Sequence, residues 1–306
     1  MRARLLLRLG DTLVVLLGVA CLVFLILHLV PGDPVDVMLG ESARPADKAA
    51  LRTDLGLDRP LGAQLLDYLG GLLRGDLGDS LQRHRPVAAL LAERLPATVQ
   101  LALAALGLAL ALALPLGMLA AHHRGRWPDR AATGVALLGL SIPNFWLGPL
   151  LILLFSLALG LTPVSGDQAP GSLILPALTL GASLAAVTTR MVRSTLLEVL
   201  GQDYVRTARA KGLSAPAVLW RHALPNAALP VLTLLGLQLG ALLAGAVITE
   251  VVFSWPGIGS LLVEAIRARD YPLVQGCVLF IAVAYETVNA LTEGLYGLLD
   301  PRVRLP

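Results

Sequence analysis

Long runs of residues without a charged side chain dominate this sequence and restrict the folds that it can adopt. The uninterrupted runs cover residues 13–30, 95–121, 131–166, 168–189 and 223–249. About 20 apolar residues suffice for a helix to cross a bilayer, whereas a membrane β-barrel would show short alternating segments. A sixth run, residues 271–295, contains Glu286 and Glu293, and it still counts because a helix in a bundle can turn polar groups inward. The sequence predicts an all-α integral membrane protein with six transmembrane helices.

Charged residues make up only 15% of the chain, against about 25% in soluble domains, which supports this class. The basic start and first apolar run could form a cleaved signal peptide. However, the run continues to Val30 without a small-x-small cleavage pattern, so we expect a retained first transmembrane helix. Neither Lys48 nor Lys211 stands in the GK[ST] context of a phosphate-binding loop. If the protein uses ATP, another chain must bind it.

Arginine and lysine residues are spread unevenly over the connecting segments, and this distribution orients the spans. With the N-terminus inside, basic residues gather on the cytoplasmic side, near the N-terminus, in residues 124–130 and 190–221, and at the C-terminus. The two short outer loops contain only two basic residues, Arg267 and Arg269. The sequence therefore predicts an N-in/C-in topology.

The segment between the first two spans is predicted to be a small helical extracytoplasmic cap. Residues 45–56 fit a short helix with Pro45 in its first turn and Gly56 as its stop. Residues 61–73 fit a second, amphipathic helix with leucines every three or four positions. We accordingly divide the chain into residues 1–93, the first span with this cap, and residues 94–301, the core.

Residues 203–230 form a basic, amphipathic segment on the predicted cytoplasmic side. Residues 203–211 fit a short helix that ends at Gly212 in the left-handed conformation. Ser214 would cap a second helix with Pro216 in its first turn, and Pro225 would bend the chain back towards the membrane. From these properties alone, the segment could equally dock a soluble partner or grip anionic headgroups.

The spacing of Ala208, Gly212 and the sequence His222-Ala-Leu-Pro resembles the EAA-type loop of permease subunits of ATP-binding-cassette (ABC) importers. Here Arg206 and His222 replace the Glu and Ile of the general pattern. The resemblance is closest to the dipeptide/oligopeptide/nickel permease family and covers almost the whole chain. The other motifs, in family order, are LVPGDP at Leu29, GLDRPL at Gly56, GDLG at Gly75, RLPAT at Arg94, SIPNF at Ser141, FSWPGIG at Phe253, RDYP at Arg269 and LDPRV at Leu299.

This resemblance implies a type I ABC importer fold in a bacterial cytoplasmic membrane, with membrane lipid around it and no nucleic-acid partner. It implies a second homologous permease subunit, two ATPase subunits and an extracytoplasmic substrate-binding protein. ATP and Mg would bind the ATPases, so this chain would hold no cofactor and catalyse nothing. The cargo would be a dipeptide or oligopeptide, with nickel-chelate or glutathione-like cargo as the alternative. The residues implied in ATPase coupling are Arg206, Ala208, Arg209, Lys211, Gly212, Leu213, Ser214 and Pro216.

Glu286 and Asn289 are candidates for the translocation pathway, because residues at i and i+3 share a helix face. An intramembrane carboxylate is a functional candidate by default, although a contact with the partner permease is an equal alternative. Glu250, at the end of the fifth span, is expected to be interfacial. The five histidines show no metal-ligand spacing, so we expect no metal. An ion-coupled secondary transporter is a competing class, but it would leave the coupling loop unexplained.

Overall fold

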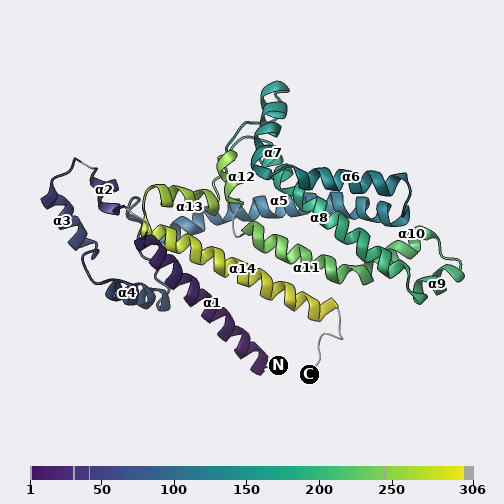
Figure 1. Ribbon diagram of the computed structural model, residues 1–306, viewed down its shortest axis with the longest axis horizontal. Coiled ribbons are helices and arrows are strands. Elements are labelled where there is room, and N and C mark those ends of the chain that lie inside the picture. The colour runs from purple at the N-terminus through teal and green to yellow at the C-terminus, as the bar shows by residue number, and fades with distance from the viewer. Residues whose placement is uncertain (1, 30–31, 41, 244–245, 300–306) are drawn as a thin grey trace. The chain divides into compact units, whose positions relative to one another are not determined.

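The computed structural model describes residues 2–29, 32–40, 42–243 and 246–299 (Figure 1). In this part of the chain the regular elements are helices, beside one isolated β-bridge between Asp79 and Pro86. The predicted all-helical fold is confirmed. Val30 and Pro31 of the first motif, residues 300–303 of the last motif and Arg304 lie outside the described residues.

The helices of the described residues, with η marking π-helices, are α1 Arg2–Leu29, α2 Pro34–Leu39, α3 Pro45–Asp54, α4 Leu61–Leu73, α5 Val87–His122, α6 Trp127–Ser141, α7 Asn144–Leu151, η1 Ile152–Ala158, α8 Ile174–Leu200, α9 Asp203–Ala210, α10 Ala215–Val218, η2 Leu219–Ala223, α11 Leu224–Leu243, α12 Val247–Val252, α13 Ile258–Arg267 and α14 Tyr271–Leu299.

Among the described residues, five helical stretches are long and apolar enough to cross a membrane. They lie in α1, α5, α8, the continuous stretch Ala215–Leu243 and α14. The number rises to six if α6 and the α7–η1 helix are counted as one span. The chain is therefore a multi-pass helical protein, while the exact count of six and the N-in/C-in orientation stay predictions.

The third predicted span, residues 131–166, is not one straight helix. It breaks between Ser141 and Asn144, and the two halves meet at an angle of 97°. Pro143 has no N–H for the helix ladder, and its ring drives Ile142 into an extended conformation, with φ −96° and ψ 115°. An uncharged run of sufficient length gave no sign of this bend, because hydropathy does not register a single backbone break.

The described residues group into two compact units. Unit 1 contains residues 1–98 and 256–286, and unit 2 contains residues 99–255 and 287–306. Unit 1 has a core of fully buried side chains from the start of α5, from α13 and from the start of α14, among them Leu90, Leu261 and Leu273. Each buried side chain of this size contributes about 1.5–3 kcal/mol. The division at residues 93 and 94 stays a prediction.

The outer segment of unit 1 contains the two helices expected from its sequence. Helix α3 begins at Pro45, and Gly56 follows it with a φ of +67°. Helix α4 runs over Leu61–Leu73, but none of its residues is fully buried. Asp270, which is 1% exposed, accepts hydrogen bonds from the hydroxyl of Ser80, the backbone N–H groups of Leu81 and Gln82, and that of Leu273. This carboxylate joins the outer segment to the start of α14.

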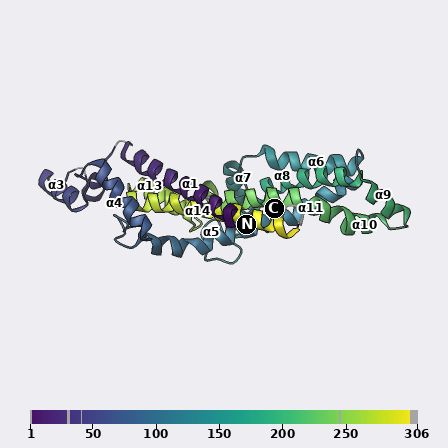
Figure 2. The same ribbon diagram turned by 90° about the horizontal axis from the view of Figure 1, so that it is seen from below.

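Unit 2 is built around α8, which packs against α6, α7 and α11 (Figures 1 and 2). The second half of α5 approaches α8 closely, since a Cβ at Gly181 would lie 3.0 Å from the carbonyl oxygen of Ala105. Gly236 of α11 likewise lies against Thr292 of α14, whose hydroxyl oxygen would be 2.2 Å from an added Cβ. Small residues that allow such close approach are typical of helix contacts in membranes.

Candidate functional site

The basic segment predicted on the cytoplasmic side forms a compact element of two short helices at the ends of α8 and α11 (Figures 1 and 2). Its small core consists of Val205 and Ala208 of α9 and Val218 of α10, all buried, with Leu213 packed against them. The end of α8, through Val199 and Leu200, packs on the same cluster. We call residues 203–218 the α9–α10 element, and its contacts hold it against α8.

The turn between the two helices has the predicted glycine geometry. Gly212 adopts a φ of +84°, and its N–H donates to the carbonyl oxygen of Arg209 at 2.9 Å. The N–H of Leu213 donates to the carbonyl oxygen of Ala208 at 3.3 Å, which closes the end of α9. A Cβ at Gly212 would meet no atom within 4 Å. A side chain would therefore fit sterically and act through backbone strain alone.

The basic side chains of the α9–α10 element are exposed. Arg206 pairs with Asp203 at 2.6 Å, but both side chains are more than 70% exposed, so the pair adds at most about 0.5 kcal/mol. Within the described residues, Arg209 and Lys211 make no ion pair. Two cations thus remain available for an external carboxylate.

Two local expectations need correction. Ser214 stands at the N-cap of α10 and Pro216 in its first turn, as predicted, but the Ser214 side chain makes no capping hydrogen bond. Pro225 does not bend the chain, because α10, η2 and α11 follow one another as one helical stretch. The wide π-turn of η2 ends at Ala223, directly before the turn that contains Pro225. This wider turn accommodates the proline ring and its missing N–H.

An ion pair that the sequence did not predict joins α6 to α8. Asp129 is 4% exposed and accepts from Arg193 Nε at 2.6 Å and Nη2 at 2.8 Å. The backbone N–H of Gly125 donates to the same carboxylate at 2.8 Å. The hint in the sequence was a Pro-Asp pair at a helix start, but nothing in it pointed to a partner 64 residues away.

The carboxylates singled out in the apolar runs have different environments. Glu286 and Asn289 are both half-buried on α14, and no hydrogen bond or ion pair involves their side chains within the described residues. Glu250 of α12 is completely buried within the chain, and its expected position at the membrane interface stays a prediction. Among the described residues, no group of three His, Cys, Asp or Glu side chains could hold a metal ion.

Comparison with known proteins identifies the family. Residues 113–305 match the family model described as "Binding-protein-dependent transport system inner membrane component", and residues 1–102 match its N-terminal counterpart. The chain belongs to this family. It is thus a permease component of an ABC transport system in the inner membrane, and it has a transport role rather than an enzymatic one.

Several curated relatives resemble this permease over 97% of both chains. It is 44% identical to the dipeptide transport system permease protein DppB of Escherichia coli strain K12 and 47% identical to the di/tripeptide transport system permease protein DppB of Pseudomonas aeruginosa. It is 43% identical to the glutathione transport system permease protein GsiC of Salmonella choleraesuis.

Two solved structures share the fold of this permease. The MetNI methionine ABC transporter in an inward-facing conformation matches 70% of this chain and 97% of its own, with a TM-score of 0.57 and 19% identity. A chain of an amino acid ABC transporter crystallised with histidines matches 70% of this chain and 94% of its own, with a TM-score of 0.51 and 16% identity. At these identities the likeness concerns the fold alone.

Proposed function

We propose that this permease forms half of the translocation pathway of an ATP-driven importer of short peptides. A second, homologous permease subunit forms the other half. Two ATPase subunits bind and hydrolyse ATP with Mg on the cytoplasmic side, and an extracytoplasmic binding protein delivers the cargo. The dipeptide and tripeptide transport named for the relatives at 44% and 47% identity supports peptide cargo.

The α9–α10 element is proposed to be the contact with an ATPase. The carrying observation is that exposed Arg209 and Lys211 project from an element whose own core, Val205, Ala208 and Val218, packs on α8. A short helix seated in a groove of a partner, with cations at the rim, is a recurrent mode of recognition. A displacement of this element by a bound ATPase would be transmitted to α8 through side-chain contacts. It can therefore bias the equilibrium between inward and outward access.

Within this element the coupling residues have different proposed roles. Arg206, Arg209 and Lys211 offer charge to the ATPase, and Ser214 and Pro216 offer exposed surface. Ala208 and Leu213 act from inside, by shaping the element. Gly212 sets the turn. Glu286 and Asn289 remain candidates for the pathway lining.

The coupling proposal is tested by ATP hydrolysis in the complex reconstituted with its ATPase and binding-protein partners. We expect Gly212→Val and Arg209→Glu to reduce cargo-stimulated hydrolysis at least tenfold, because the first strains the turn and the second reverses a docking charge. Arg124→Glu is the matched control, since Arg124 is exposed and lies outside the element; it should keep stimulation. Full stimulation in both coupling variants would refute the docking role.

The cargo is tested separately. The share of identity with the glutathione permease is nearly the same as with the dipeptide permeases, so glutathione is the second candidate. Calorimetry of the co-purified external binding protein with alanyl-alanine and with glutathione decides between them. Tight binding of the dipeptide and weak binding of glutathione is the expected result, and the reverse order would change the cargo assignment.

A further inference from the structure

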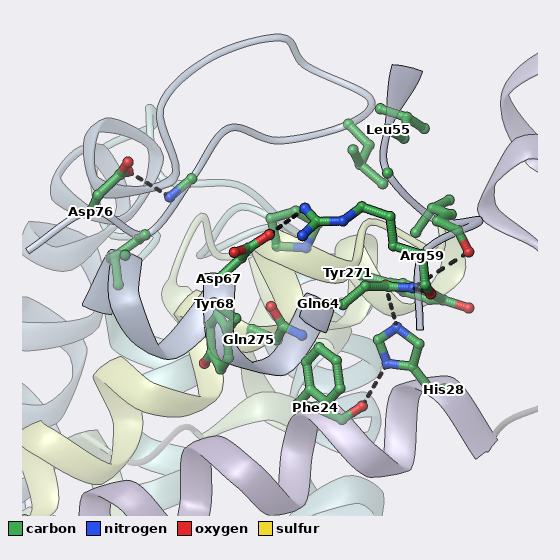
Figure 3. Close-up of a pocket in the computed structure, with 17 residues that line it drawn as sticks. Phe24, His28, Leu55, Arg59, Gln64, Asp67, Tyr68, Asp76, Tyr271 and Gln275 are labelled. Atoms are coloured by element: carbon green, nitrogen blue, oxygen red, sulfur yellow. Dashed lines mark hydrogen bonds and ion pairs between the residues drawn. The ribbon is translucent and has the colours of Figure 1, made fainter. Parts of the chain in front are cut away.

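A cavity of about 300 Å³ lies in unit 1, in the segment that the topology prediction places outside the membrane (Figure 3). It is open on one side and lined by the end of α1, the turn before α4, α4 itself, the loop of residues 76–81 and the start of α14. Three aromatic residues, Phe24, Tyr68 and Tyr271, contribute to its walls. Its volume is at the lower end of the range for small-molecule sites. The proposed coupling function does not use it.

Two polar side chains of this cavity have no hydrogen-bond partner within the described residues, the hydroxyl of Tyr68 and the amide of Gln275. Gln275 is 7% exposed, lines the cavity, and makes no hydrogen bond within the described part of the chain (Figure 3). The amide atoms of Gln275 are not among the fully buried unpaired atoms, so they keep access to the open space of the cavity, where a ligand or water can pair with them. The Gln275 amide offers donors and an acceptor, which matches the complementary pattern of a peptide bond.

The amide nitrogen of the other glutamine of the cavity, by contrast, already has a hydrogen-bond partner. Gln64 Nε2 donates to the carbonyl oxygen of Arg59 at 2.8 Å, and its Oε1 lies 3.2 Å from Nε2 of His28. Nδ1 of His28 lies 2.8 Å from the carbonyl oxygen of Phe24 and donates to it. These bonds fix one wall. They leave Gln275 as the amide of the cavity with free hydrogen-bonding capacity.

The cavity also carries one positive and one negative charge at its rim. Arg59 Nη1 donates to Asp67 Oδ2, and both side chains are more than half exposed (Figure 3). An exposed pair of this kind contributes little to stability, so it can be shared with a ligand at little cost. Asp67 has a second oxygen and Arg59 has further N–H donors for such a ligand. Adjacent opposite charges suit a molecule that itself carries both.

We propose that this cavity is a binding site for one short zwitterionic peptide, of dipeptide size. The peptide bond pairs with the Gln275 amide, the terminal ammonium lies at Asp67, and the terminal carboxylate lies at Arg59. This site rests on the proposed peptide cargo and adds to it a binding site on the permease itself.

The test is calorimetry of L-alanyl-L-alanine with the purified full-length permease, without binding protein or ATPases. Wild type should show saturable binding. Gln275→Leu keeps the side-chain size and removes the amide, so the dissociation constant should rise at least about tenfold. Gln168→Leu makes the same change at an exposed position in unit 2 and should bind as wild type.

Two further arms keep the proposal open to refutation if Gln275→Leu folds poorly. Asp67→Asn alters an exposed side chain and should weaken the binding of dialanine about tenfold. N-acetyl-dialanine amide has no terminal charges, and it should bind the wild type as weakly as dialanine binds Asp67→Asn. No saturable binding to wild type, or unchanged binding in Gln275→Leu and Asp67→Asn, would overturn the site. A failure of this site can be told apart from a failure of the cargo proposal. The present experiment uses the permease without the binding protein, whereas the cargo experiment uses the binding protein without the permease.

Discussion

At the scale of single residues, the hydroxyl of Tyr68 stands out because it is buried and has no hydrogen-bond partner among the described residues. The usual penalty for such a group is about 1–3 kcal/mol. Tyr68→Phe should therefore raise thermal stability in detergent, by about 1 kcal/mol, although most core substitutions lower it. A lower midpoint in the variant would show that the hydroxyl has a partner, such as water.

The same phenol predicts a pH dependence. Burial raises the pKa of Tyr68 to about 12, while an unfolded tyrosine titrates near 10. The neutral phenol is favoured in the folded state, so its contribution to stability is complete below pH 10 and is lost as the pH rises towards 12. Ultraviolet titration should show a tyrosine with this late ionisation, and Tyr68→Phe should abolish it.

Asp270 is a second residue with a large expected effect. Its buried carboxylate accepts from the side chain of Ser80 and from backbone N–H groups on both sides of the contact. Asp270→Ala leaves these donors unpaired and should destabilise unit 1 by about 3 kcal/mol. Asp76→Ala removes one exposed hydrogen bond, to the N–H of Gly78, and should cost about 1 kcal/mol or less. Equal thermal shifts for the two variants would contradict this role.

At the scale of elements, the pairing of α6 with α8 depends on Asp129 and Arg193. Removing one partner of a mostly buried pair leaves an uncompensated charge. Because Arg193 is 31% exposed, we expect Asp129→Ala to cost about 2–3 kcal/mol rather than the full penalty. The double variant Asp129→Ala/Arg193→Met should recover part of this loss. If the double variant loses more stability than the two single variants lose together, the pairing is refuted.

Elements that depend on local chemistry could be predicted from the sequence. Pro45 and Gly56 bound α3, and Gly212 ends α9, because each acts through its own backbone preferences. Features that depend on distant partners could not. The burial of Glu250 and the partner of Asp129 follow from how helices pack, and no local pattern encodes that packing.

The candidate site likewise has features that could be predicted from the sequence and features that could not. Its location and its turn followed from spacing and glycine, while the burial of Ala208 against Val218 required the folded chain. The bent third span lies between these cases, because Pro143 was visible but prolines in membrane helices are often tolerated without a sharp break.

At the scale of the whole molecule, the N-in/C-in topology is open to a direct test. In a background without Cys21 and Cys277, Arg209→Cys should react with a membrane-impermeant maleimide only in inside-out vesicles. Asp58→Cys, in the outer segment, should react only in intact spheroplasts. Both residues are exposed, so reactivity reports the side of the membrane. The opposite pattern would show that the topology is inverted. The α9–α10 element would then lie on the side of the membrane away from the ATPases.

The unbroken path from α10 through η2 into α11 has a consequence for how the chain tolerates changes in length. Each residue added to or deleted from a helix rotates everything beyond it by about 100°. A single-residue deletion between Gly212 and Gly236 would turn the surface of α10 away from α9, or lift Gly236 from Thr292. The same deletion in residues 160–173, between η1 and α8, would be absorbed by a loop. The stretch from Gly212 to Gly236 is thus a part of the gene where insertions and deletions should be strongly selected against.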